Sequence, residues 1–376
     1  MFDAAPRVLF LTDLLEVGGA ETQLVEMLRT LRALPVEADL AVLTPRLDRG
    51  LAVALPAPPI EIAWKGPGDL RGWRRLADTV RLGDYDVLCT THAWSAVSAP
   101  GLIRRGPTSK PRRWLAFEHG FRRGAARGLL EPIRRRALRR ADRVIAVSRA
   151  QGEWIEGAFG VDREKILVLP NAIDTTEGQI SSEERATERA TWRRRLGLRA
   201  DSLLTVSVAR LVPEKDPITL VEAWARLEAG AARDSHLLLV GDGPERARVQ
   251  KRCEALGIAA RVHLLGTIRP PRAVLAAADL FALASVSESQ GIAVLEAMAA
   301  SLPVVATDVG GLPEVVVPEE TGLLAPSNDP VALGAALSRA LLDGAWRVRA
   351  GQAGRDRVVR RFDSLLRARL LVEQFA

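Results

Sequence analysis

The sequence predicts an α/β protein built from two doubly wound domains, each a parallel sheet with helices on both faces. Short apolar runs alternate with longer helix-forming stretches through both halves of the chain. Strands that are buried on both faces have this nearly continuous apolar character. The length of 376 residues fits two domains, and 48% hydrophobic residues are ample for two cores.

The expected strands fall into two groups separated by a polar stretch. The first group lies at 8–11, 40–43, 60–63, 87–90, 114–117, 144–147 and 166–169, and the second at 203–208, 237–240, 262–265, 280–283, 304–306 and 322–324. The stretch from Asp174 to Gly197 is typical of a linker that leads into a charged helix. We therefore expect a first domain over 1–172, a linker and connecting helix over 173–199, a second domain over 200–356 and a final helix over 357–376.

Composition favours a soluble cytoplasmic protein. Cys89 and Cys253 are too few and too far apart for a metal site or a disulfide framework, and they fit two buried thiols in a reducing compartment. The apolar run at 8–11 ends at Thr12, far short of a signal sequence, and no apolar run reaches the length of a membrane span.

The net charge of +7 lies in the first half of the chain. Residues 104–149 hold 15 basic and 3 acidic side chains, and Leu129, Ile133 and Ala137 recur every four positions among them. This spacing predicts a helix with one apolar stripe and a cationic face. The cationic face has two open interpretations: it binds an anionic membrane reversibly, or it is merely a solvated surface. Binding of nucleic acid is disfavoured, because no RNP-type motif or zinc spacing accompanies the charge and aromatic residues are only 5%.

The segment 285–298 carries the strongest indication of function. Glu288 and Glu296 lie eight positions apart and bracket Gly291 and Ile292, where an apolar helix begins after a strand. The free amides at such a helix start attract a phosphate. The two carboxylates can accept hydrogen bonds from different sugar hydroxyls. This layout suits a nucleotide-sugar site, although a solvated loop glutamate and a helix-face glutamate have the same spacing.

Further candidate residues follow other strands, where open parallel sheets bind their ligands. Arg210 and Lys215 leave the strand at 203–208 in one loop, so both cationic groups can meet one diphosphate, although surface ion pairs remain the alternative. Gly18 and Gly19 follow the first strand and would let a ligand approach the backbone, although a glycine pair is more often a simple turn. His119 follows the strand at 114–117, an unusual place for a core histidine.

Two other motifs partly match signatures of other protein classes but lack the context that those signatures need. Asp84-Tyr85-Asp86 matches an Asp-x-Asp metal motif, but it precedes a strand and so lies at the wrong edge of the sheet. Gly241-Asp242-Gly243 has Arg246 where a dinucleotide fingerprint needs a third glycine, which disfavours a nicotinamide oxidoreductase.

Together these motifs resemble the family 4 retaining glycosyltransferases over nearly the whole chain. The segment 285–298 is similar to that family's carboxylate-x7-carboxylate signature, and the other matching segments are Gly18-Gly19-Ala20-Glu21, Glu118-His119-Gly120, Pro170-Asn171-Ala172-Ile173-Asp174, Val208-Ala209-Arg210-Leu211 with Lys215-Asp216, and Gly241-Asp242-Gly243-Pro244. The chain departs from the family pattern at Ser289-Gln290, at Ala172 and at Asp216.

The resemblance implies a GT-B fold, in which two Rossmann-like domains face each other across a cleft and the final helix crosses back to the first domain. It implies transfer of a sugar from a nucleoside diphosphate sugar to a glycan or lipid-linked acceptor in envelope or exopolysaccharide synthesis, with retention of configuration and without metal or other cofactor. The implied catalytic residues are His119, Glu288, Arg210 and Lys215. The donor would meet Gly18, Gly19, Arg210, Lys215, Glu288, Gly291, Ile292 and Glu296. A non-catalytic sugar-nucleotide-binding partner, or a phosphorylase or epimerase on this fold, remains the alternative.

Overall fold

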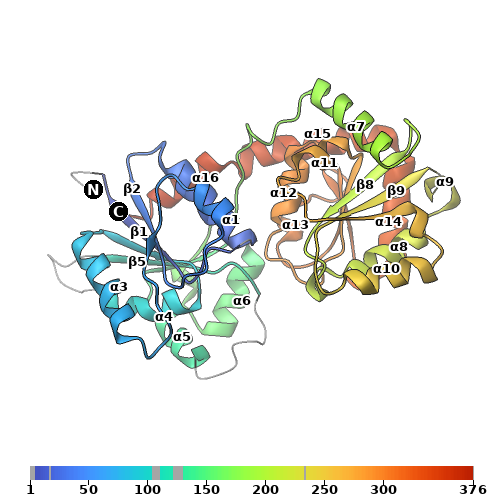
Figure 1. Cartoon of the computed structure of the whole chain (residues 1–376). Helices are drawn as coiled ribbons and strands as arrows, with labels where there is room; N and C mark the ends of the chain where they lie inside the picture. The colour runs from blue at the N-terminus through green and yellow to red at the C-terminus, as the bar shows by residue number, and fades with distance from the viewer. Residues whose placement is uncertain (1–4, 17, 104–110, 122–129, 233, 376) are drawn as a thin grey trace. The chain divides into compact units, whose positions relative to one another are not determined.

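The computed structural model describes residues 5–16, 18–103, 111–121, 130–232 and 234–375. The chain forms two compact units (Figure 1). Unit 1 comprises Met1–Ala172 together with Ser364–Ala376, and unit 2 comprises Ile173–Asp363. The expected linker and connecting helix at 173–199 therefore belong to unit 2.

Unit 1 is built on one parallel sheet of seven strands in the order β3-β2-β1-β4-β5-β6-β7. Its strands are β1 (Arg7–Thr12), β2 (Glu37–Val42), β3 (Ile60–Glu61), β4 (Val87–Thr90), β5 (Arg113–Phe117), β6 (Arg143–Ala146) and β7 (Ile166–Val168). Strand β2 begins earlier than expected, because Glu37 pairs with Arg7 at the start of β1. Edge strand β3 is shorter than expected, because only Ile60 and Glu61 pair with β2.

Both faces of this sheet are covered by helices. Val8 and Phe10 of β1 pack into one core with α1 and α16, whereas Leu9 and Leu11 pack into a second core with α3, α4, α5 and α6. Alternate residues of a strand point to opposite faces, so a strand buried on both sides must be apolar throughout. The helices are α1 (Gly19–Leu31), α2 (Arg49–Val53), α3 (Leu70–Leu82), α4 (Ala93–Leu102), α5 (Leu130–Leu138), α6 (Arg149–Phe159) and α16 (Ser364–Val372), with a 3-10 turn η1 (Arg163–Lys165).

Unit 2 repeats the plan with six parallel strands in the order β10-β9-β8-β11-β12-β13. The strands are β8 (Leu203–Val208), β9 (Ser235–Val240), β10 (Val262–Gly266), β11 (Leu280–Leu283), β12 (Val304–Thr307) and β13 (Gly322–Ala325). The helices and 3-10 turns are α7 (Ser182–Arg195), η2 (Pro213–Lys215), α8 (Pro217–Ala225), α9 (Ala229–Ala232), α10 (Arg246–Ala255), η3 (Ala259–Arg261), α11 (Arg272–Ala277), α12 (Ile292–Ala299), α13 (Leu312–Val315), α14 (Pro330–Leu342) and α15 (Gly344–Arg361).

The C-terminal segment differs from the single helix expected at 357–376. Helix α15 ends at Arg361 within unit 2, and α16 begins at Ser364 and packs on α1 of unit 1. The buried Gln23 side chain of α1 exchanges two hydrogen bonds of 2.9 Å with the backbone of Ala172 and accepts a third from Arg367 of α16. The segment 170–174, one of the matching segments, and the C-terminal helix α16 are thus joined through the buried amide of Gln23.

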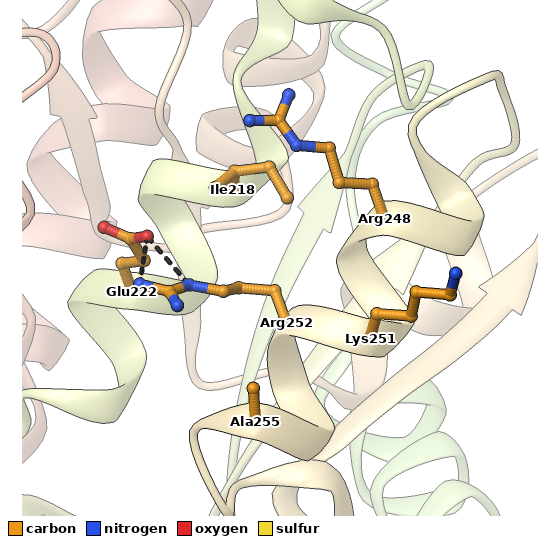
Figure 2. A pocket seen from close by; sticks show the side chains of 6 residues that line it. All are labelled: Ile218, Glu222, Arg248, Lys251, Arg252 and Ala255. Carbon is orange, nitrogen blue, oxygen red and sulfur yellow. Dashed lines mark hydrogen bonds and ion pairs between the residues drawn. The ribbon is translucent and has the colours of Figure 1, made fainter.

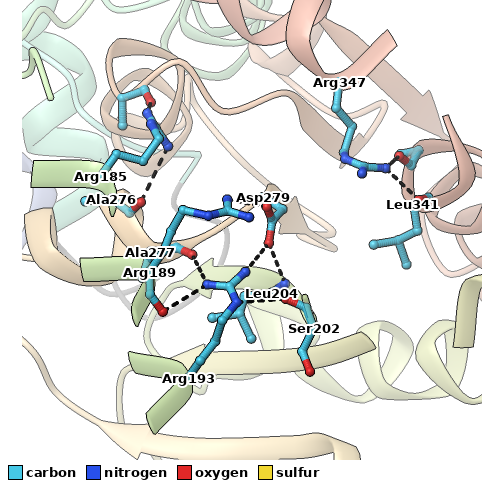
Figure 3. Close-up of polar contacts among 12 residues, drawn as sticks. Arg185, Arg189, Arg193, Ser202, Leu204, Ala276, Ala277, Asp279, Leu341 and Arg347 are labelled. Carbon is cyan, nitrogen blue, oxygen red and sulfur yellow. Dashed lines mark hydrogen bonds and ion pairs between the residues drawn. The ribbon is translucent and has the colours of Figure 1, made fainter. Parts of the chain in front are cut away.

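A network of arginines, of which Arg193 is buried, fastens α7 to the sheet of unit 2 (Figure 3). Asp279, which directly precedes β11, pairs with Arg189 and Arg193 of α7 and also accepts the backbone N–H of Leu204. The Arg193 guanidinium also donates to the carbonyls of Ser202, Ala277 and Arg189 at 3.0 to 3.2 Å. Asp279 and Arg193 each have several partners, which is what a buried ion pair needs in order to be tolerated.

Candidate functional site

In each sheet there is one pair of neighbouring strands from which the chain continues in opposite directions, and this position is the switch point of the sheet. The predicted residues are described below according to the sheet to which they belong. In unit 2 the switch point lies between β8 and β11, and in unit 1 between β1 and β4. Loops that leave such strands at their carboxyl ends form the ligand crevice of open α/β sheets. Arg210, Lys215, Glu288, Gly291, Ile292 and Glu296 belong to unit 2, whereas Gly18, Gly19 and His119 belong to unit 1.

The loop that carries Arg210 is supported by the glycine turn after β9. A Cβ at Gly241 would lie 1.9 Å from the carbonyl oxygen of Ala209, so only glycine permits this approach. The backbone N–H of Leu211 then donates to the carbonyl of Asp242 at 2.9 Å. Arg210, between these anchors, is exposed, and its side chain forms no hydrogen bond or ion pair with any residue that the structure describes. Its guanidinium is available to an anion.

Lys215 ends the 3-10 turn η2 and forms an ion pair with Glu288, so these two predicted residues are in direct contact. The next residue, Asp216, has a φ of 41° and accepts a hydrogen bond from the N–H of Thr219, which caps α8. This left-handed conformation favours glycine, and aspartate tolerates it while also supplying the cap. The departure from the family pattern at Asp216 therefore preserves the local backbone.

The loop that carries Glu288 is fixed to its neighbours by backbone groups. The carbonyl of Glu288 accepts the N–H of Gly311 at 3.0 Å, and the N–H of Val286 donates to the carbonyl of Glu214 at 3.0 Å. The Thr307 hydroxyl donates to the carbonyl of Ser285 at 2.6 Å. The carboxylate is thereby held beside Lys215 by contacts on both sides of the loop.

Helix α12 starts beside this loop with unused donors. Gly291 has a φ of 90°, and its carbonyl accepts the N–H groups of Val294 and Leu295. The amides of Gly291, Ile292 and Ala293 donate to no acceptor within the described part of the chain. Free amides and the positive end of the helix dipole together form an anion-binding site.

Glu296 lies in the second turn of α12 and is half-buried. Burial raises its pKa to about 7, an effect that Arg269 partly opposes. A carboxyl that has lost its hydration and gained no donor is destabilised in its charged form. A ligand that donates hydrogen bonds to this group would favour the carboxylate.

Among the predicted residues of unit 1, His119 has the most unusual surroundings. It directly follows Glu118 after β5, and its ring is stacked near that of Phe117 with the centroids 6.1 Å apart. Both ring nitrogens are shielded from solvent and form no hydrogen bond with a described residue. Burial lowers the pKa of His119 to about 3, with smaller contributions from His92 and Arg367, so the ring is neutral at physiological pH.

Gly18 and Gly19 form the start of α1, at the switch point of unit 1. Gly18 is the N-cap in an extended conformation and Gly19 is the first helical residue. The carboxylate of Glu21, in the first turn, lies beside Gly18 and is also 3.1 Å from Nε2 of His92. Neither Glu21 nor His92 is among the site residues predicted from the sequence. Glu21 lies two positions after the glycine pair and His92 two positions after the end of β4, and this placement could have indicated the pairing.

The basic segment of unit 1 differs from the expected amphipathic helix. Leu129 and parts of the segment lie outside the described residues. In α5, Ile133 is 51% exposed, whereas Ala137 is buried. Arg134 is also buried and pairs with Glu118, so it does not contribute to a cationic surface. The prediction is therefore wrong for Ile133, whereas Ala137 lies on the buried face of α5 together with Arg134 and Leu138.

A surface hollow in unit 2 lies apart from the predicted residues. It is lined by Ile218 and Glu222 of α8 and by Arg248, Lys251, Arg252 and Ala255 of α10 (Figure 2). Arg252 already pairs with Glu222, and Arg248 pairs with Glu245. Because Arg248 and Arg252 each already have a carboxylate partner, the hollow gives no indication of a ligand.

The Asp84-Tyr85-Asp86 motif lies before β4, at the amino edge of the sheet. There the carboxylate of Asp86 accepts the backbone N–H of Arg7 at 3.0 Å. The described residues contain no group of three or more histidine, cysteine, aspartate or glutamate side chains arranged to hold a metal. Across the same residues, no helix combines the length and apolarity that a membrane crossing requires.

Comparison with solved structures identifies the class of the fold. HepE of Anabaena, solved in complex with UDP, superposes with a TM-score of 0.82 at 22% identity and covers 98% of this chain and 99% of its own. The architecture is thus that of the GT-B glycosyltransferases, with two Rossmann-like domains.

Comparison of sequences identifies the family. The model of "Glycosyltransferase Family 4" matches residues 17–177, and that of "Glycosyl transferases group 1" matches residues 188–357. A GDP-mannose-dependent alpha-(1-6)-phosphatidylinositol monomannoside mannosyltransferase of Mycolicibacterium smegmatis is 32% identical over 73% of this chain and 72% of its own length. The chain belongs to the family 4 glycosyltransferases.

Other relatives match a smaller part of the chain. The D-inositol 3-phosphate glycosyltransferase of Actinosynnema mirum is 35% identical over 57% of this chain. The matched region spans about half the length of that relative, at 52%.

Proposed function

We propose that the protein is a retaining glycosyltransferase that moves a sugar from a nucleoside diphosphate sugar to a hydroxyl-bearing acceptor. The observation that carries this proposal is the grouping at the unit 2 switch point of the Lys215–Glu288 ion pair, the unpaired Arg210 and the free amides at the start of α12. Cationic side chains and helix amides bind a diphosphate, and a carboxylate beside them binds sugar hydroxyls.

In this proposal the donor rearranges the Lys215–Glu288 pair. The diphosphate attracts the Lys215 ammonium, and Glu288 turns its carboxylate to the hydroxyls of the sugar. Negative charge grows on the diphosphate as the bond to the anomeric carbon breaks. Arg210, Lys215 and the amides of Gly291 and Ile292 stabilise that charge, an electrostatic contribution often worth several kcal/mol in other enzymes.

The reaction is proposed to keep the anomeric configuration without a covalent enzyme intermediate. The acceptor oxygen bonds to the anomeric carbon on the face that the diphosphate leaves, and the acceptor proton passes to a phosphate oxygen of the departing group. His119, neutral because of its low pKa, can hydrogen-bond with a substrate hydroxyl in unit 1. No metal is required, since protein groups supply the positive charge.

The acceptor is proposed to be a polyol, glycan or lipid-linked sugar of the cell envelope. The relatives named above are called glycosyltransferases of inositol phosphate and of phosphatidylinositol mannoside, which supports this class. A non-catalytic sugar-nucleotide-binding protein would need neither Arg210 nor His119. A phosphorylase would use phosphate as the acceptor, and an epimerase would use none.

Product analysis tests the reaction. Purified protein is incubated with UDP-glucose, UDP-N-acetylglucosamine or GDP-mannose, together with myo-inositol, D-inositol 3-phosphate or phosphatidylinositol, and the product is examined by NMR. We expect one glycoside with the anomeric configuration of its donor, formed equally in excess EDTA. An inverted product would contradict a retaining mechanism, and activity that requires added Mg²⁺ or Mn²⁺ would contradict metal independence.

Nucleotide binding is expected to release a proton through Glu296. Its pKa of about 7 lies above the ordinary value of 4.5, so the carboxyl is largely protonated in the free protein below pH 7. Ribose hydroxyls that donate to the carboxylate favour the charged form and lower this pKa. Calorimetric titration with UDP and GDP at pH 6.5, in buffers of different ionisation enthalpy, should show more proton release for the wild type than for Glu296→Gln. Equal buffer dependence would remove Glu296 from the nucleotide site.

The same pKa shift affects stability. Between pH 4.5 and about 7 the folded state holds the Glu296 proton more strongly than the unfolded state does, so the contribution of this group to stability falls as pH rises through that window.

We infer that the exposed arginines of unit 1 hold the enzyme reversibly at the inner face of an anionic membrane, close to a lipid-linked acceptor. Arg135, Arg136 and Arg140 are exposed on and just after α5. Each basic side chain close to an anionic bilayer contributes about 1 kcal/mol, and the attraction is screened by salt. Contact with the headgroups suffices for this attraction, and no helix needs to be inserted.

Sedimentation with phosphatidylglycerol vesicles tests this contact. Binding should fall as ionic strength rises and should weaken when Arg135, Arg136 and Arg140 are replaced by Ser. The matched control replaces three other exposed arginines of unit 1, Arg49, Arg71 and Arg74. Equal loss in both triple variants, or equal binding to neutral vesicles, would leave the arginines as a solvated face.

A further inference from the structure

A carboxylate and a histidine meet at the switch point of unit 1, outside the residues assigned above. Oε1 of Glu21, in the first turn of α1, lies 3.1 Å from Nε2 of His92, which follows β4. Strands β1 and β4 are adjacent and parallel. The two side chains therefore come together at the carboxyl edge of the sheet, where ligands of such folds bind.

His92 is held on several sides, and both of its ring nitrogens are used within the protein. Nδ1 lies 2.9 Å from the Thr12 hydroxyl and 3.1 Å from the Thr91 hydroxyl. The backbone N–H of His92 donates to the Ser95 hydroxyl at 3.0 Å. The start of α4 is also fixed by Asp13, which accepts the N–H of Ser95 at 2.6 Å. Consequently His92 is fully engaged, and its effect is to fix the Glu21 carboxylate.

The second oxygen of Glu21 is not used in this way. Oε2 forms no hydrogen bond with a described residue, and the side chain is 10% exposed. It lies over Gly18, where a Cβ would come within 2.3 Å of it, so the glycine leaves the space that this oxygen occupies. The carboxylate also lies in the first turn of α1, near the positive end of the helix dipole. A fixed carboxylate oxygen of this kind accepts a hydroxyl and repels a phosphate.

His119 adds a second unused polar group to this edge. It follows β5, which is adjacent to β4, and neither of its ring nitrogens has a partner among the described residues. Shielded polar atoms without partners are costly, and their presence indicates a ligand.

We propose that Glu21 binds a hydroxyl of the acceptor through Oε2, and that His92 is the positioning residue that fixes this carboxylate. The inference rests on the proposed transferase function and extends it to the acceptor. The proposed acceptor is a polyol or a sugar. A free hydroxyl of this acceptor, and not a phosphate, donates a hydrogen bond to Glu21. Gly18 then has a role on the acceptor side, as the residue that leaves room for the carboxylate.

Two substitutions of His92 separate positioning from helix capping. Glutamine places an amide N–H near the position of Nε2, so His92→Gln can still donate to Glu21. Asparagine is too short to do so, but it is a preferred helix N-cap. We therefore expect His92→Gln to keep kcat/KM for the acceptor within about threefold of wild type. We expect Glu21→Gln and His92→Asn to lower it by about 10- to 100-fold, as for the loss of one charged hydrogen bond.

The measurements use myo-inositol, octyl α-mannoside and D-inositol 3-phosphate as acceptors, with thermal shift by UDP or GDP recorded for every variant. Glu37→Gln, which removes an exposed carboxylate of unit 1, is the matched control and should behave as wild type. Retained nucleotide shift and melting temperature, with acceptor kcat/KM lost only in Glu21→Gln and His92→Asn, would support the proposal.

Three outcomes would overturn it. In the first, Glu21→Gln glycosylates the acceptor as wild type does. In the second, His92→Asn is active and His92→Gln is not, as expected if His92 acts only as the N-cap of α4. In the third, the wild type hydrolyses its donor but glycosylates no polyol. Failure of the proposed function itself is distinguishable, because the wild type would then show neither a nucleotide shift nor donor cleavage.

Discussion

Replacement of Arg210 or Lys215 by Ala is expected to lower kcat at saturating donor by about 100-fold or more. Each cation stabilises charge that develops on the diphosphate only as the anomeric bond breaks, so its loss affects the transition state more than the bound donor. Lys251→Ala, at an exposed lysine of α10, is the control and should keep wild-type turnover.

The two variants should differ in their other properties. Arg210 is exposed and unpaired among the described residues, so Arg210→Ala should keep the melting temperature of the wild type. Lys215→Ala leaves Glu288 without its ionic partner, so the donor KM should change together with kcat. Steady-state kinetics and calorimetry on both proteins check these expectations. Wild-type turnover in both variants would remove the diphosphate clamp from the mechanism.

Replacement of Asp279 by Ala is expected to lower the free energy of unfolding of unit 2 by about 3–5 kcal/mol. The side chain is 8% exposed and is shared by Arg189 and Arg193, and Arg193 is itself 3% exposed. Removal of the carboxylate leaves the Arg193 guanidinium buried without an opposite charge. The backbone N–H of Leu204, at the start of β8, also loses its acceptor.

Calorimetric unfolding of the full chain measures this effect in the transition of unit 2. Asp201→Ala is the control, because the Arg199–Asp201 pair is exposed on both sides at 66% and 67%. An exposed pair contributes at most about 1 kcal/mol, so this variant should unfold nearly as the wild type does. If the two variants shift the transition equally, the arginine network does not fasten α7 to the sheet.

The sequence by itself determined the local features of this protein. Buried parallel strands are apolar throughout, so their positions could be read as short runs, and their alternation with helices predicted the two doubly wound sheets. Arg210, Lys215 and Glu288 could be chosen because residues that leave the carboxyl ends of strands lie at the ligand edge. The grouping of the Lys215–Glu288 pair with the start of α12 agrees with that rule.

Only the tertiary structure decided which distant residues meet. Glu21 and His92 are paired because β1 and β4 are neighbours, although 71 positions separate them in the chain. Arg134 belongs to an arginine-rich run whose members look alike in sequence, yet it is buried because Glu118 lies beneath it. Strand order and the cost of an unpaired buried charge are properties of the whole sheet, and local composition and periodicity carry no record of them.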